Sequence, residues 1–565
     1  MKKQRTESKV KPLMITFGFI FIVILIVLLV EAVQRFTPSK EVEDLRTYYG
    51  IEQDDDVAII QDNEKQETKG KYIDGTVYLM YDTVHDDYNS RFYWDNNENI
   101  LLYTKPEGMV KAELGAAEYT VGKETVAAEH PPVRSVGEQV YVALDFVQQY
   151  TDMKTEYYDN PHRIVLTTKF DNQKQAVVEK ATQIRVRGGI KSPILRELKE
   201  QDTVVVLEQG EDWNHVATAD GVTGYMKKKY CSALTEVAQE HTFEEDVYPK
   251  NKMDTKVNLV WHQVTEASAN AGIQKLLAGT KGVNVVSPTW FYLNDNEGNI
   301  GSLADRSYVD YCHQSKVKVW GLLSNLVNTD VDTAAVLTYT SRRMNLVNQI
   351  VAAAIQYDLD GINVDIETVP KEVGDGYVQF IRELSLKCAN NGLTLSVDNY
   401  VPSEYTAFYR RAEQAVFADY IIVMGYDEHY VGSEEGSTAS IGFVRQGVQD
   451  TLEEVPADQV ILGMPFYTRL WSLKSNERTS QAMGMREAEN IVKVNGAQPV
   501  WQEDLGQYYA EYQNQDVTYK IWLETQESLD LKLKVMSEQS LAGAAFWKLG
   551  LEKTEIWDTI IKYMN

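Results

Sequence analysis

The acidic side chains of Asp360-Gly-Ile-Asn-Val-Asp-Ile-Glu367 have the clearest capacity for chemistry in this chain. The alternation of polar and apolar residues predicts a β-strand, in which Asn363, Asp365 and Glu367 point to one face at intervals of about 6.6 Å. Carboxylates in a row on a covered strand repel each other and lose hydration, so the pattern favours a catalytic site. The alternative is an edge strand with a solvated polar face. Long helical segments on both sides indicate instead a parallel sheet that is covered on both faces.

Strands and helices alternate from residue 250 to residue 565, and eight β/α units of this kind predict an α/β TIM-type (β/α)8 barrel. The eight strands are expected at Val257–Val264, Val283–Tyr292, Val317–Ser324, Gly361–Glu367, Leu393–Tyr400, Tyr420–Tyr426, Val460–Pro465 and Leu541–Trp547. A long interval, 471–527, separates the last two strands. It contains a predicted helix near Arg486–Lys493 and a predicted hairpin around Tyr508–Leu523, so we expect a small α+β insertion that forms one wall of a cleft.

Polar and aromatic side chains follow several of these strands, where barrel enzymes place their catalytic groups. Glu367 ends the fourth strand, Asp427 follows the sixth, Tyr467 and Arg469 follow the seventh, and Trp547 ends the eighth. A role in the core explains any one of these residues but not all of them. The sequence therefore predicts that they converge at one mouth of the barrel.

Four motifs give this region a family resemblance: Asp360-Gly361-x-x-x-Asp-x-Glu, Met424-Gly-Tyr426-Asp427, Gly463-x-Pro-x-Tyr467-x-Arg469, and Trp547. Together they resemble family 18 glycoside hydrolases over residues 250–565. The form Asp-Gly-x-Asn-x-Asp-x-Glu is nearest to the cell-wall and spore N-acetylglucosaminidases of bacteria. The resemblance implies a chitinase-like glycosidase that acts on polysaccharides containing N-acetylglucosamine, with no cofactor and no metal.

The placement of Asp365 and Glu367 suits substrate-assisted hydrolysis better than a mechanism with a protein nucleophile. A protein nucleophile and an acid must flank the anomeric carbon, whereas Asp365 and Glu367 are neighbours on one strand. Substrate-assisted hydrolysis removes this difficulty, because the 2-acetamido oxygen of the sugar attacks instead. We then expect Glu367 to be the general acid and Asp365 to bind the acetamido N–H and to raise the pKa of Glu367 by repulsion.

The resemblance implies roles for the remaining residues. Tyr426 is expected to donate to the acetamido oxygen, and Trp547 to form the floor of the sugar subsite. The resemblance also implies substrate contacts for Asp427, Tyr467 and Arg469, and a structural role for Asp360 and Gly361. Asn363 is a departure, because most of the family has an aspartate there. We expect Asn363 to donate a hydrogen bond to Asp365 and to alter the pH profile more than it lowers activity.

The composition excludes some classes of partner and site. With 56 Lys and Arg against 83 Asp and Glu, the net charge of −27 disfavours nucleic acid and anionic lipid. The three cysteines lie far apart and predict neither a disulfide framework nor a zinc site. No metal-binding pattern is found among the eight histidines.

The amino-terminal region predicts export. Residues 1–12 are basic, as expected of a cytoplasmic tail, and residues 13–30 are apolar and long enough to cross a membrane as one helix. A cleaved signal peptide is the alternative, but the apolar run is long and its end is a poor cleavage site. We therefore expect a single-pass signal anchor in the cell membrane, with the rest of the chain extracellular.

Three segments are expected between the anchor and the barrel. Residues 31–70 are polar and acidic, which predicts a linker. Residues 71–175 contain two copies of a strand, short helix and hairpin pattern that resembles the amino-terminal domain of copper amine oxidases, without copper ligands. Residues 178–236 predict an all-β domain that resembles bacterial SH3-like domains. Residues 71–236 are expected to contact the cell wall or, for 71–175, to act as a spacer.

Several functions remain open on these observations. The first is a surface-anchored hydrolase of β-linked N-acetylglucosamine glycans, with peptidoglycan favoured over chitin by the anchor and the middle domains. A chitinase or chitooligosaccharide hydrolase is the nearest alternative. The third is a silent, lectin-like wall-binding protein, which the presence of Glu367, Asp365 and Tyr426 disfavours.

Overall fold

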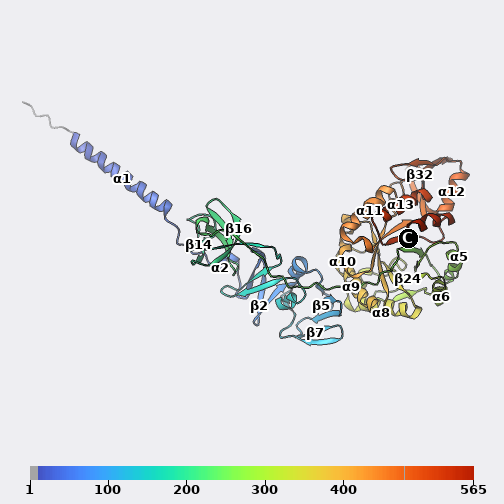
Figure 1. Cartoon of the computed structure of the whole chain (residues 1–565), viewed down its shortest axis with the longest axis horizontal. Helices are drawn as coiled ribbons and strands as arrows, with labels where there is room; N and C mark the ends of the chain where they lie inside the picture. The colour runs from blue at the N-terminus through green and yellow to red at the C-terminus, as the bar shows by residue number, and fades with distance from the viewer. Residues whose placement is uncertain (1–9, 476, 565) are drawn as a thin grey trace, which may run out of the picture. The chain divides into compact units, whose positions relative to one another are not determined.

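The computed structural model describes residues 10–475 and 477–564 and divides the chain into two compact units (Figure 1). One unit contains Met1–Phe92, Leu114–Glu118 and Ala127–Glu245. The other contains Tyr93–Glu113, Tyr119–Val126 and Asp246–Asn565. Each unit is described by itself.

The second unit is built around a closed barrel of eight parallel strands. These are β20 (Val257–His262), β21 (Val285–Pro288), β24 (Lys318–Ser324), β25 (Gly361–Asp365), β26 (Thr394–Tyr400), β27 (Tyr420–Met424), β28 (Val460–Pro465) and β34 (Gly543–Trp547). Each strand pairs in parallel with the next, and β34 pairs with both β28 and β20, which closes the sheet. The predicted barrel and its eight strands are confirmed.

Helices surround the barrel, as Figure 1 shows around β24. They include α5 (Ile273–Leu277), α6 (Arg306–Gln314), α8 (Thr340–Tyr357), α9 (Gly374–Asn390), α10 (Arg411–Phe417), α11 (Ile441–Glu454), α13 (Gln526–Glu538) and α14 (Trp557–Ile560). Apolar side chains of the strands, such as Ile362 and Val364, are fully buried in a core shared with these helices. A second core, which includes Trp261, Trp320 and Tyr420, contains the opposite faces of the strands. The strands are thus covered on both faces, as the apolar runs in the sequence require.

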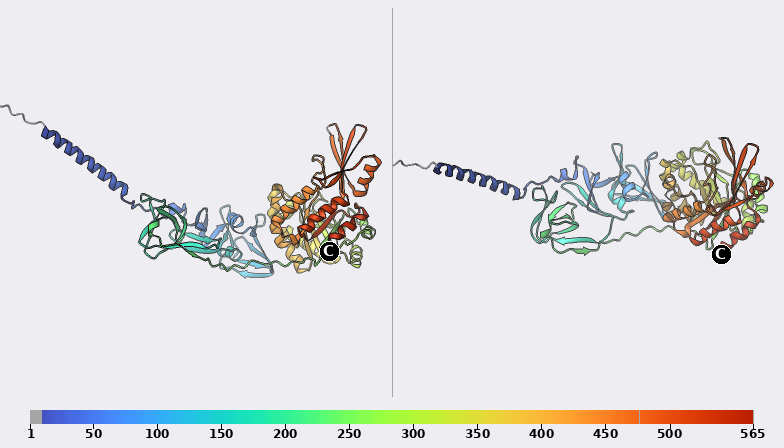
Figure 2. Two further views of the ribbon diagram at one scale, coloured as in Figure 1. Left: turned by 45° about the horizontal axis from the view of Figure 1, so that its top comes forward. Right: turned by 90° about the horizontal axis from the view of Figure 1, so that it is seen from above.

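The interval between β28 and β34 forms the predicted α+β insertion. It consists of β29 (Tyr467–Lys474), β30 (Glu477–Gly484), α12 (Met485–Val494), β31 (Val500–Gln502), β32 (Gln507–Asn514) and β33 (Val517–Leu523). The five strands form one antiparallel sheet, which projects from the barrel in Figure 2. The sheet begins at Tyr467, four residues earlier than predicted, because the strand that follows β28 continues directly into it.

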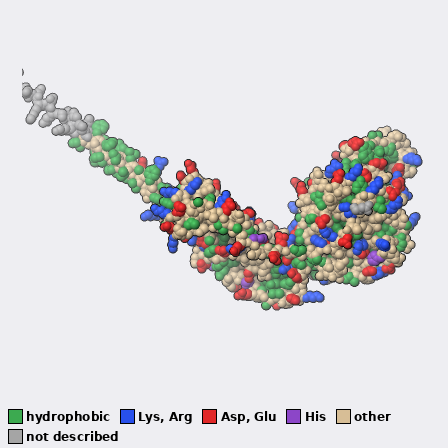
Figure 3. Space-filling model, in the orientation of Figure 1, with side chains coloured by type: hydrophobic (Ala, Val, Ile, Leu, Met, Phe, Trp, Pro, Cys, Tyr) green, Lys and Arg blue, Asp and Glu red, His purple; other side chains and the backbone are tan. Residues whose placement is uncertain are grey.

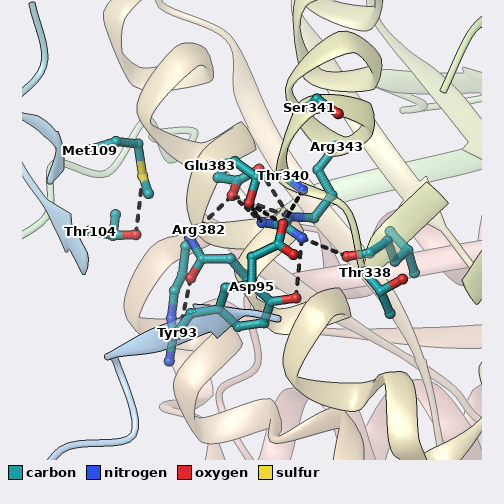
Figure 4. Close-up of polar contacts among 12 residues, drawn as sticks. Tyr93, Asp95, Thr104, Met109, Thr338, Thr340, Ser341, Arg343, Arg382 and Glu383 are labelled. Carbon is teal, nitrogen blue, oxygen red and sulfur yellow. Dashed lines mark hydrogen bonds and ion pairs between the residues drawn. The ribbon is translucent and has the colours of Figure 1, made fainter. Parts of the chain in front are cut away.

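A small sheet from the middle of the chain groups with the barrel. It contains β4 (Tyr93–Asp95), β5 (Ile100–Lys105), β6 (Gly108–Glu113), β7 (Glu118–Val121) and β8 (Glu124–Ala127). Asp95 accepts hydrogen bonds from the backbone N–H and the hydroxyl of Thr340 at the start of α8, both at 2.6 Å. Arg343 on α8 donates to Tyr93 and forms a fully buried ion pair with Glu383 on α9 (Figure 4). The region predicted as one domain, 71–175, is therefore divided between the two units.

The first unit contains two antiparallel-rich sheets of seven strands each. The first sheet contains β1 (Asp56–Gln61), β2 (Glu64–Ile73), β3 (Thr76–Met80), β9 (Val133–Val136), β10 (Gln139–Ala143), β11 (Lys154–Tyr158) and β12 (Arg163–Thr167). The second contains β13 (Gln173–Val177), β14 (Thr182–Arg185), β15 (Ile194–Leu198), β16 (Thr203–Gln209), β17 (Trp213–Ala217), β18 (Thr223–Lys227) and β19 (Thr235–Val237). The predicted all-β character of 178–236 is confirmed.

The prediction of a linker at 31–70 is wrong for most of this stretch. The helix α2 (Leu45–Tyr49), the strand β1 and most of β2 lie within it. The apolar run Val57-Ala-Ile-Ile60 is almost completely buried in β1, and β1 pairs with β2 and with the distant strand β12. The acidic composition of the stretch conceals this short buried run.

The amino-terminal helix α1 (Val10–Phe36) contains an apolar segment, Ile15–Phe36, with a mean hydropathy of 2.9. Its described side chains from Ile15 onward are exposed to solvent, and Figure 3 shows hydrophobic side chains along the helix. Length and composition allow this helix to cross a membrane or to serve as a signal sequence.

Candidate active site

The motif strand β25 places its residues as the alternation predicted. Asn363 is completely buried toward the barrel interior, whereas Ile362 and Val364 are buried in the core on the helix side. Gly361 allows close packing at the start of the strand, since a Cβ atom there would lie 2.5 Å from the carbonyl oxygen of Thr394. The strand ladder ends at Asp365, so Glu367 follows the last paired residue.

Glu367 is positioned by Tyr400, at the end of one neighbouring strand, and by Asn325, directly after the other. Its carboxylate accepts a hydrogen bond of 2.6 Å from the Tyr400 hydroxyl at the end of β26. Its backbone N–H donates to Oδ1 of Asn325 at 2.9 Å, and its carbonyl oxygen accepts from Nδ2 of Asn325 at 2.8 Å. Asn325 therefore continues the pattern of hydrogen bonds where the sheet itself ends.

The environment of Glu367 raises the pKa of its carboxyl. Burial is the largest cause, and the negative charge of Asp427 adds to it, while the hydrogen bond from Tyr400 lowers the pKa. Repulsion from Asp365 was the predicted cause, but burial is the largest one for Glu367, and Asp427 adds to it. The repulsion between Asp365 and Glu367 is mutual, and at Asp365 it adds to burial and to the charge of Asp398. A half-buried carboxyl with a raised pKa is suited to donating a proton near neutral pH.

Asp365 has an unsatisfied oxygen. Its Oδ1 is buried, and no donor in residues 10–475 and 477–564 reaches it. Burial raises the pKa of Asp365 well above its ordinary value, and the charges of Asp398 and Glu367 raise it further. A buried acceptor without a donor is unfavourable in the free protein, so this oxygen is available for a donor from a ligand.

Asn363 does not have the predicted contact with Asp365. Its Oδ1 accepts from Trp261 Nε1 at 2.9 Å and from Ser287 Oγ at 3.0 Å. Its Nδ2 donates to Ser396 Oγ at 3.0 Å and to Asp398 Oδ1 at 2.8 Å. Because both amide hydrogens are already donated to β26, the prediction that Asn363 donates to Asp365 is wrong.

Asp398 is a third buried carboxyl at this site, and the sequence analysis did not identify it. It is 4% exposed and lies on β26, one position beyond the paired residues Val364 and Val397. Continuing the register makes Asp398 the cross-strand neighbour of Asp365. Burial raises the pKa of Asp398 well above its ordinary value, whereas the hydrogen bond from Asn363 lowers it.

Aromatic side chains lie beside these carboxyls. The Trp261 ring lies 5.9 Å from Trp547 and 6.4 Å from Tyr426, measured between ring centroids. Trp547 and Tyr426 are both half-buried, and Tyr426 also packs edge-on against Tyr467 with centroids 6.3 Å apart. Burial raises the pKa of Tyr426 well above 10, and Asp398 adds to this effect, so its hydroxyl stays protonated and can donate. The structure thus brings the predicted Tyr426 and Trp547 together.

Asp427, Tyr467 and Arg469 form one hydrogen-bonded group. The Tyr467 hydroxyl donates to Asp427 at 2.6 Å, and the Arg469 guanidinium lies 3.5 Å from the same oxygen. Asp427 is exposed, and Arg469 is half-buried with a buried Nε that finds no acceptor among the described residues. The predicted convergence of these residues is present in the structure.

Asp360 lies at the other end of β25, away from Glu367. Its carboxylate accepts from His313 Nε2 at 2.9 Å and from the backbone N–H of Val319 at 2.8 Å, and Lys318 lies 3.3 Å away. These contacts join β25 to α6 and β24. They agree with a structural function.

Asn325, Asp398 and Tyr400 were missed by the sequence analysis. The segment Ser396-Val-Asp-Asn-Tyr400 has the same alternation of side chains as the motif strand, and this signal was present in the sequence. Asn325 follows the third barrel strand directly, a position that also predicts a site residue.

Comparison with known proteins gives two family matches. Residues 313–552 match the family described as Glycosyl hydrolases family 18, and residues 59–166 match the Copper amine oxidase N-terminal domain. The chain is 25% identical over 292 residues to the uncharacterized glycosylase YvbX of Bacillus subtilis, covering 50% of this chain and 84% of that protein. It is 25% identical over 225 residues to the cortical fragment-lytic enzyme of Bacillus subtilis, covering 38% of this chain and 52% of that enzyme.

Solved structures show the same fold. The C-terminal domain of a putative chitinase from Desulfitobacterium hafniense aligns with 55% of this chain and 100% of that domain, with 19% identity and a TM-score of 0.51. The spore cortex-lytic enzyme SleL of Bacillus cereus aligns with 58% of this chain and 78% of that enzyme, with 17% identity and a TM-score of 0.50. The two resemblances, to family 18 and to the copper amine oxidase domain, are confirmed.

Proposed function

We propose, from the premise that the barrel is a glycosidase domain of glycosyl hydrolase family 18, that this protein cleaves β-linked N-acetylglucosamine glycans and that peptidoglycan is its main substrate. The reaction is substrate-assisted and retains the configuration of the anomeric carbon. Glu367 is the general acid and base, and Asp365 binds the acetamido group of the substrate.

The unsatisfied oxygen of Asp365 is the observation that carries this proposal. It is buried beside a carboxyl, Glu367, that is protonated more readily than an ordinary glutamate. The N–H of a 2-acetamido group, which lies two atoms from the anomeric carbon, is a donor that can satisfy this oxygen when the substrate is bound. A sugar with a hydroxyl at that position offers no N–H and no acetamido oxygen.

The proposed reaction has two steps. First, Glu367 gives its proton to the glycosidic oxygen while the acetamido oxygen bonds to the anomeric carbon, and the leaving sugar departs with a new hydroxyl. Asp365 stabilises the positive charge that develops on the acetamido nitrogen. Second, the Glu367 carboxylate takes a proton from water while the water oxygen attacks the anomeric carbon. The bond between the acetamido oxygen and that carbon breaks, which restores the acetamido group.

The remaining site residues have supporting functions in this proposal. Tyr426 donates to the acetamido oxygen and Trp547 forms the apolar floor beneath the sugar ring. Tyr467 and Arg469 hold the exposed carboxylate of Asp427, which then contacts substrate hydroxyl groups. Asn363 acts through its hydrogen bonds to the neighbouring strands.

Peptidoglycan is favoured by the relatives and by the rest of the chain. Matched relatives include a cortical fragment-lytic enzyme and a putative sporulation-specific glycosylase of Bacillus subtilis. The described helix Ile15–Phe36 acts as a signal anchor in this proposal and places the barrel outside the cell, with a cleaved signal peptide as the alternative. The two sheets of the first unit, including the SH3-like segment 178–236, then contact the wall.

Product analysis tests the proposal directly. The protein is incubated with purified peptidoglycan and with chitin oligomers, and the released fragments are identified by mass spectrometry. We expect muropeptides that end in N-acetylglucosamine, and Glu367→Gln should lower their release by at least about 100-fold. The exposed Glu372→Gln is the matched control and should retain activity.

The alternatives give different results. Cleavage of chitin oligomers with no release from peptidoglycan would identify a chitooligosaccharide hydrolase. Saturable binding of N-acetylglucosamine oligomers without products at any pH would identify a lectin-like protein. A Glu367→Gln variant with wild-type turnover would disprove the assignment of the acid.

A further inference from the structure

The site has three buried or half-buried carboxyls, and the proposed mechanism uses two of them. Asp398 has no direct part in it, yet Asp398 is buried on the strand beside Asp365. A buried carboxyl near two others is costly unless it has a partner or a proton. Asn363 donates to its Oδ1, and Trp261 also interacts with the carboxyl, but both are neutral donors and neither supplies an opposite charge.

The geometry makes Asp365 and Asp398 a cross-strand pair. The register of β25 and β26 aligns Asn363 with Ser396 and Val364 with Val397, and the next two residues are Asp365 and Asp398. In a parallel pair, neighbouring strands lie about 4.8 Å apart, and side chains at the same level point to the same face. Both carboxyls therefore face the barrel interior, on the side where Trp261 lies.

Asn363 holds Asp398 in this position and leaves one oxygen of each aspartate for the other. Nδ2 of Asn363 binds Oδ1 of Asp398, which keeps Oδ2 of Asp398 outside that contact. Oδ1 of Asp365 is buried and has no donor among the described residues. Two acceptors at one level, close together and out of water, are stable together when one of them carries a proton.

We propose that Asp365 and Asp398 share one proton across the strands β25 and β26, and that Asp398 keeps this proton while Asp365 binds the acetamido group. This inference rests on the proposed glycosidase function. Most of the family has an aspartate where this chain has Asn363. In this chain Asp398, on the neighbouring strand β26, supplies the carboxyl that Asn363 lacks. In this proposal Asp398 acts through Asp365 and not on the substrate, so it is a positioning residue.

The proton balance of the step is simple. In the free protein the pair carries one proton and one negative charge. When the acetamido oxygen bonds to the anomeric carbon, the proton moves to Asp398 and the negative charge is on Asp365, next to the positive acetamido nitrogen. When water opens the ring, that nitrogen becomes neutral and the proton is shared again. The pair neither gains nor loses a proton in the complete reaction.

The ionisable groups around the pair should not obscure the loss of the shared proton in a pH profile. Among the described residues, Glu367, Tyr377, Tyr409 and Tyr426 interact electrostatically with the pair. Tyr400 and Asp427 interact with Glu367, and Arg411 with Tyr377 and Tyr409. Burial raises the pKa of each of these tyrosines, to about 12 for Tyr409, so they remain neutral below pH 10. Changes below pH 10 therefore come from the carboxyls.

The test compares three variants of the full protein on an N-acetylglucosamine oligosaccharide with a fluorogenic leaving group. Asp398→Asn should lower kcat by about 100-fold. In the wild-type protein the fall of kcat/KM at high pH should reflect the loss of two protons, one from Glu367 and one from the pair, and in Asp398→Asn the loss of one. The double variant Asn363→Asp with Asp398→Asn returns the carboxyl to β25. Its kcat should be at least tenfold higher than that of Asp398→Asn, and its kcat/KM should again fall with the loss of two protons at high pH.

Ser396→Ala is the matched control for a merely structural effect. It removes the other acceptor of Asn363 Nδ2 and leaves the carboxyl in place. It should lower kcat by less than tenfold and keep the two-proton limb. The proposal is wrong if Ser396→Ala reproduces both changes of Asp398→Asn, or if Asp398→Asn keeps the wild-type profile.

A second measurement requires no turnover and no folded double variant. Infrared spectra of the ligand-free protein at neutral pH should contain a band from a protonated carboxyl that is lost equally in Asp365→Asn and in Asp398→Asn. A separate band should be lost only in Glu367→Gln. If the wild-type protein hydrolyses no N-acetylglucosamine substrate, the proposed function fails, whereas a band unaffected by either aspartate substitution disproves the shared proton.

Discussion

Asn325 binds the peptide groups on both sides of Glu367, accepting from its N–H at 2.9 Å and donating to its carbonyl oxygen at 2.8 Å. The strand ladder has already ended at Asp365, and Thr368 has a positive φ of 52°. The backbone position of Glu367, the proposed acid, therefore depends on Asn325, the residue directly after the neighbouring strand β24.

Replacing Asn325 with alanine should lower kcat by about 10- to 100-fold with less than a threefold change in KM. A displacement of about 1 Å of a catalytic group has effects of this size, and sugar contacts made by other residues remain. Steady-state kinetics on an oligosaccharide measure both constants. The neighbouring exposed Leu326→Ala is the control, and an equal loss in both variants would contradict the role of Asn325.

The pH dependence of activity should respond in opposite directions to two substitutions around Glu367. Tyr400 lowers the pKa of Glu367 by donating to its charged form, whereas Asp427 raises it by repulsion. In the proposed mechanism Glu367 must be protonated to act, so the alkaline limb of kcat/KM follows its pKa. Tyr400→Phe should move that limb to higher pH and Asp427→Asn to lower pH.

Both profiles are measured between pH 4 and pH 9 with the same substrate. Tyr467→Phe is the control for Asp427→Asn, because it removes the hydrogen bond to Asp427 and leaves the charge. Shifts of the same sign in Tyr400→Phe and Asp427→Asn would contradict this explanation of the Glu367 pKa.

The carboxyls of the site should make the fold less stable as the pH rises. The pKa values of Asp365, Glu367 and Asp398 are all raised in the folded protein. The folded state then binds more protons than the unfolded chain above pH 4, so stability falls as the pH rises toward the folded pKa values. Below the unfolded pKa values of about 4 this difference disappears.

Glu367→Gln should therefore raise the melting temperature at pH 8 and leave it almost unchanged at pH 4. Each kcal/mol recovered corresponds to about 1–2 °C, because the unfolding entropy of about 2.1 cal/mol/K per residue sums over roughly 350 residues. Calorimetry at the two pH values, with Glu372→Gln as control, measures the difference. An equal change at both pH values would show that packing, not ionisation, is responsible.

Sequence patterns predicted the barrel and the residues at its mouth for a common physical reason. Each barrel strand is apolar on the helix side, and each is followed by a helix, so both the strand and its carboxyl end could be located. Glu367, Asp427 and Trp547 are recognisable because they interrupt apolar strands at their ends.

Residues that act through a neighbouring strand were not predicted. Alternation in Ser396–Tyr400 marks Asp398 and Tyr400 as candidates, but only the register of β25 and β26 places Asp398 beside Asp365. The four hydrogen bonds of Asn363 likewise involve three other strands, β20, β21 and β26. Periodicity within one strand indicates which face a side chain takes, but not which residue of the neighbouring strand lies at the same level. The grouping of β4–β8 with the barrel depends likewise on contacts such as Asp95 to Thr340, which are 245 residues apart in sequence.

The contact between this small sheet and the barrel should be important for the stability of the second unit. Asp95 binds the start of α8, and Arg343 and Glu383 form an ion pair with both side chains fully buried (Figure 4). Asp95→Ala removes a helix-capping acceptor and should destabilise the unit by about 1–2 kcal/mol. Arg343→Met leaves Glu383 buried without its charge partner and should cost about 3–5 kcal/mol.

The double variant Arg343→Met with Glu383→Leu separates charge from packing. It removes the uncompensated carboxylate, so it should be more stable than Arg343→Met alone, because buried ion pairs can often be replaced by apolar residues at little cost. Urea unfolding followed by tryptophan fluorescence compares the variants. Glu383→Leu alone completes the comparison. If the loss of unfolding free energy in the double variant equals the sum of the losses in Arg343→Met and Glu383→Leu, the pair acts through packing alone, and the buried charge of Glu383 is not the source of the loss.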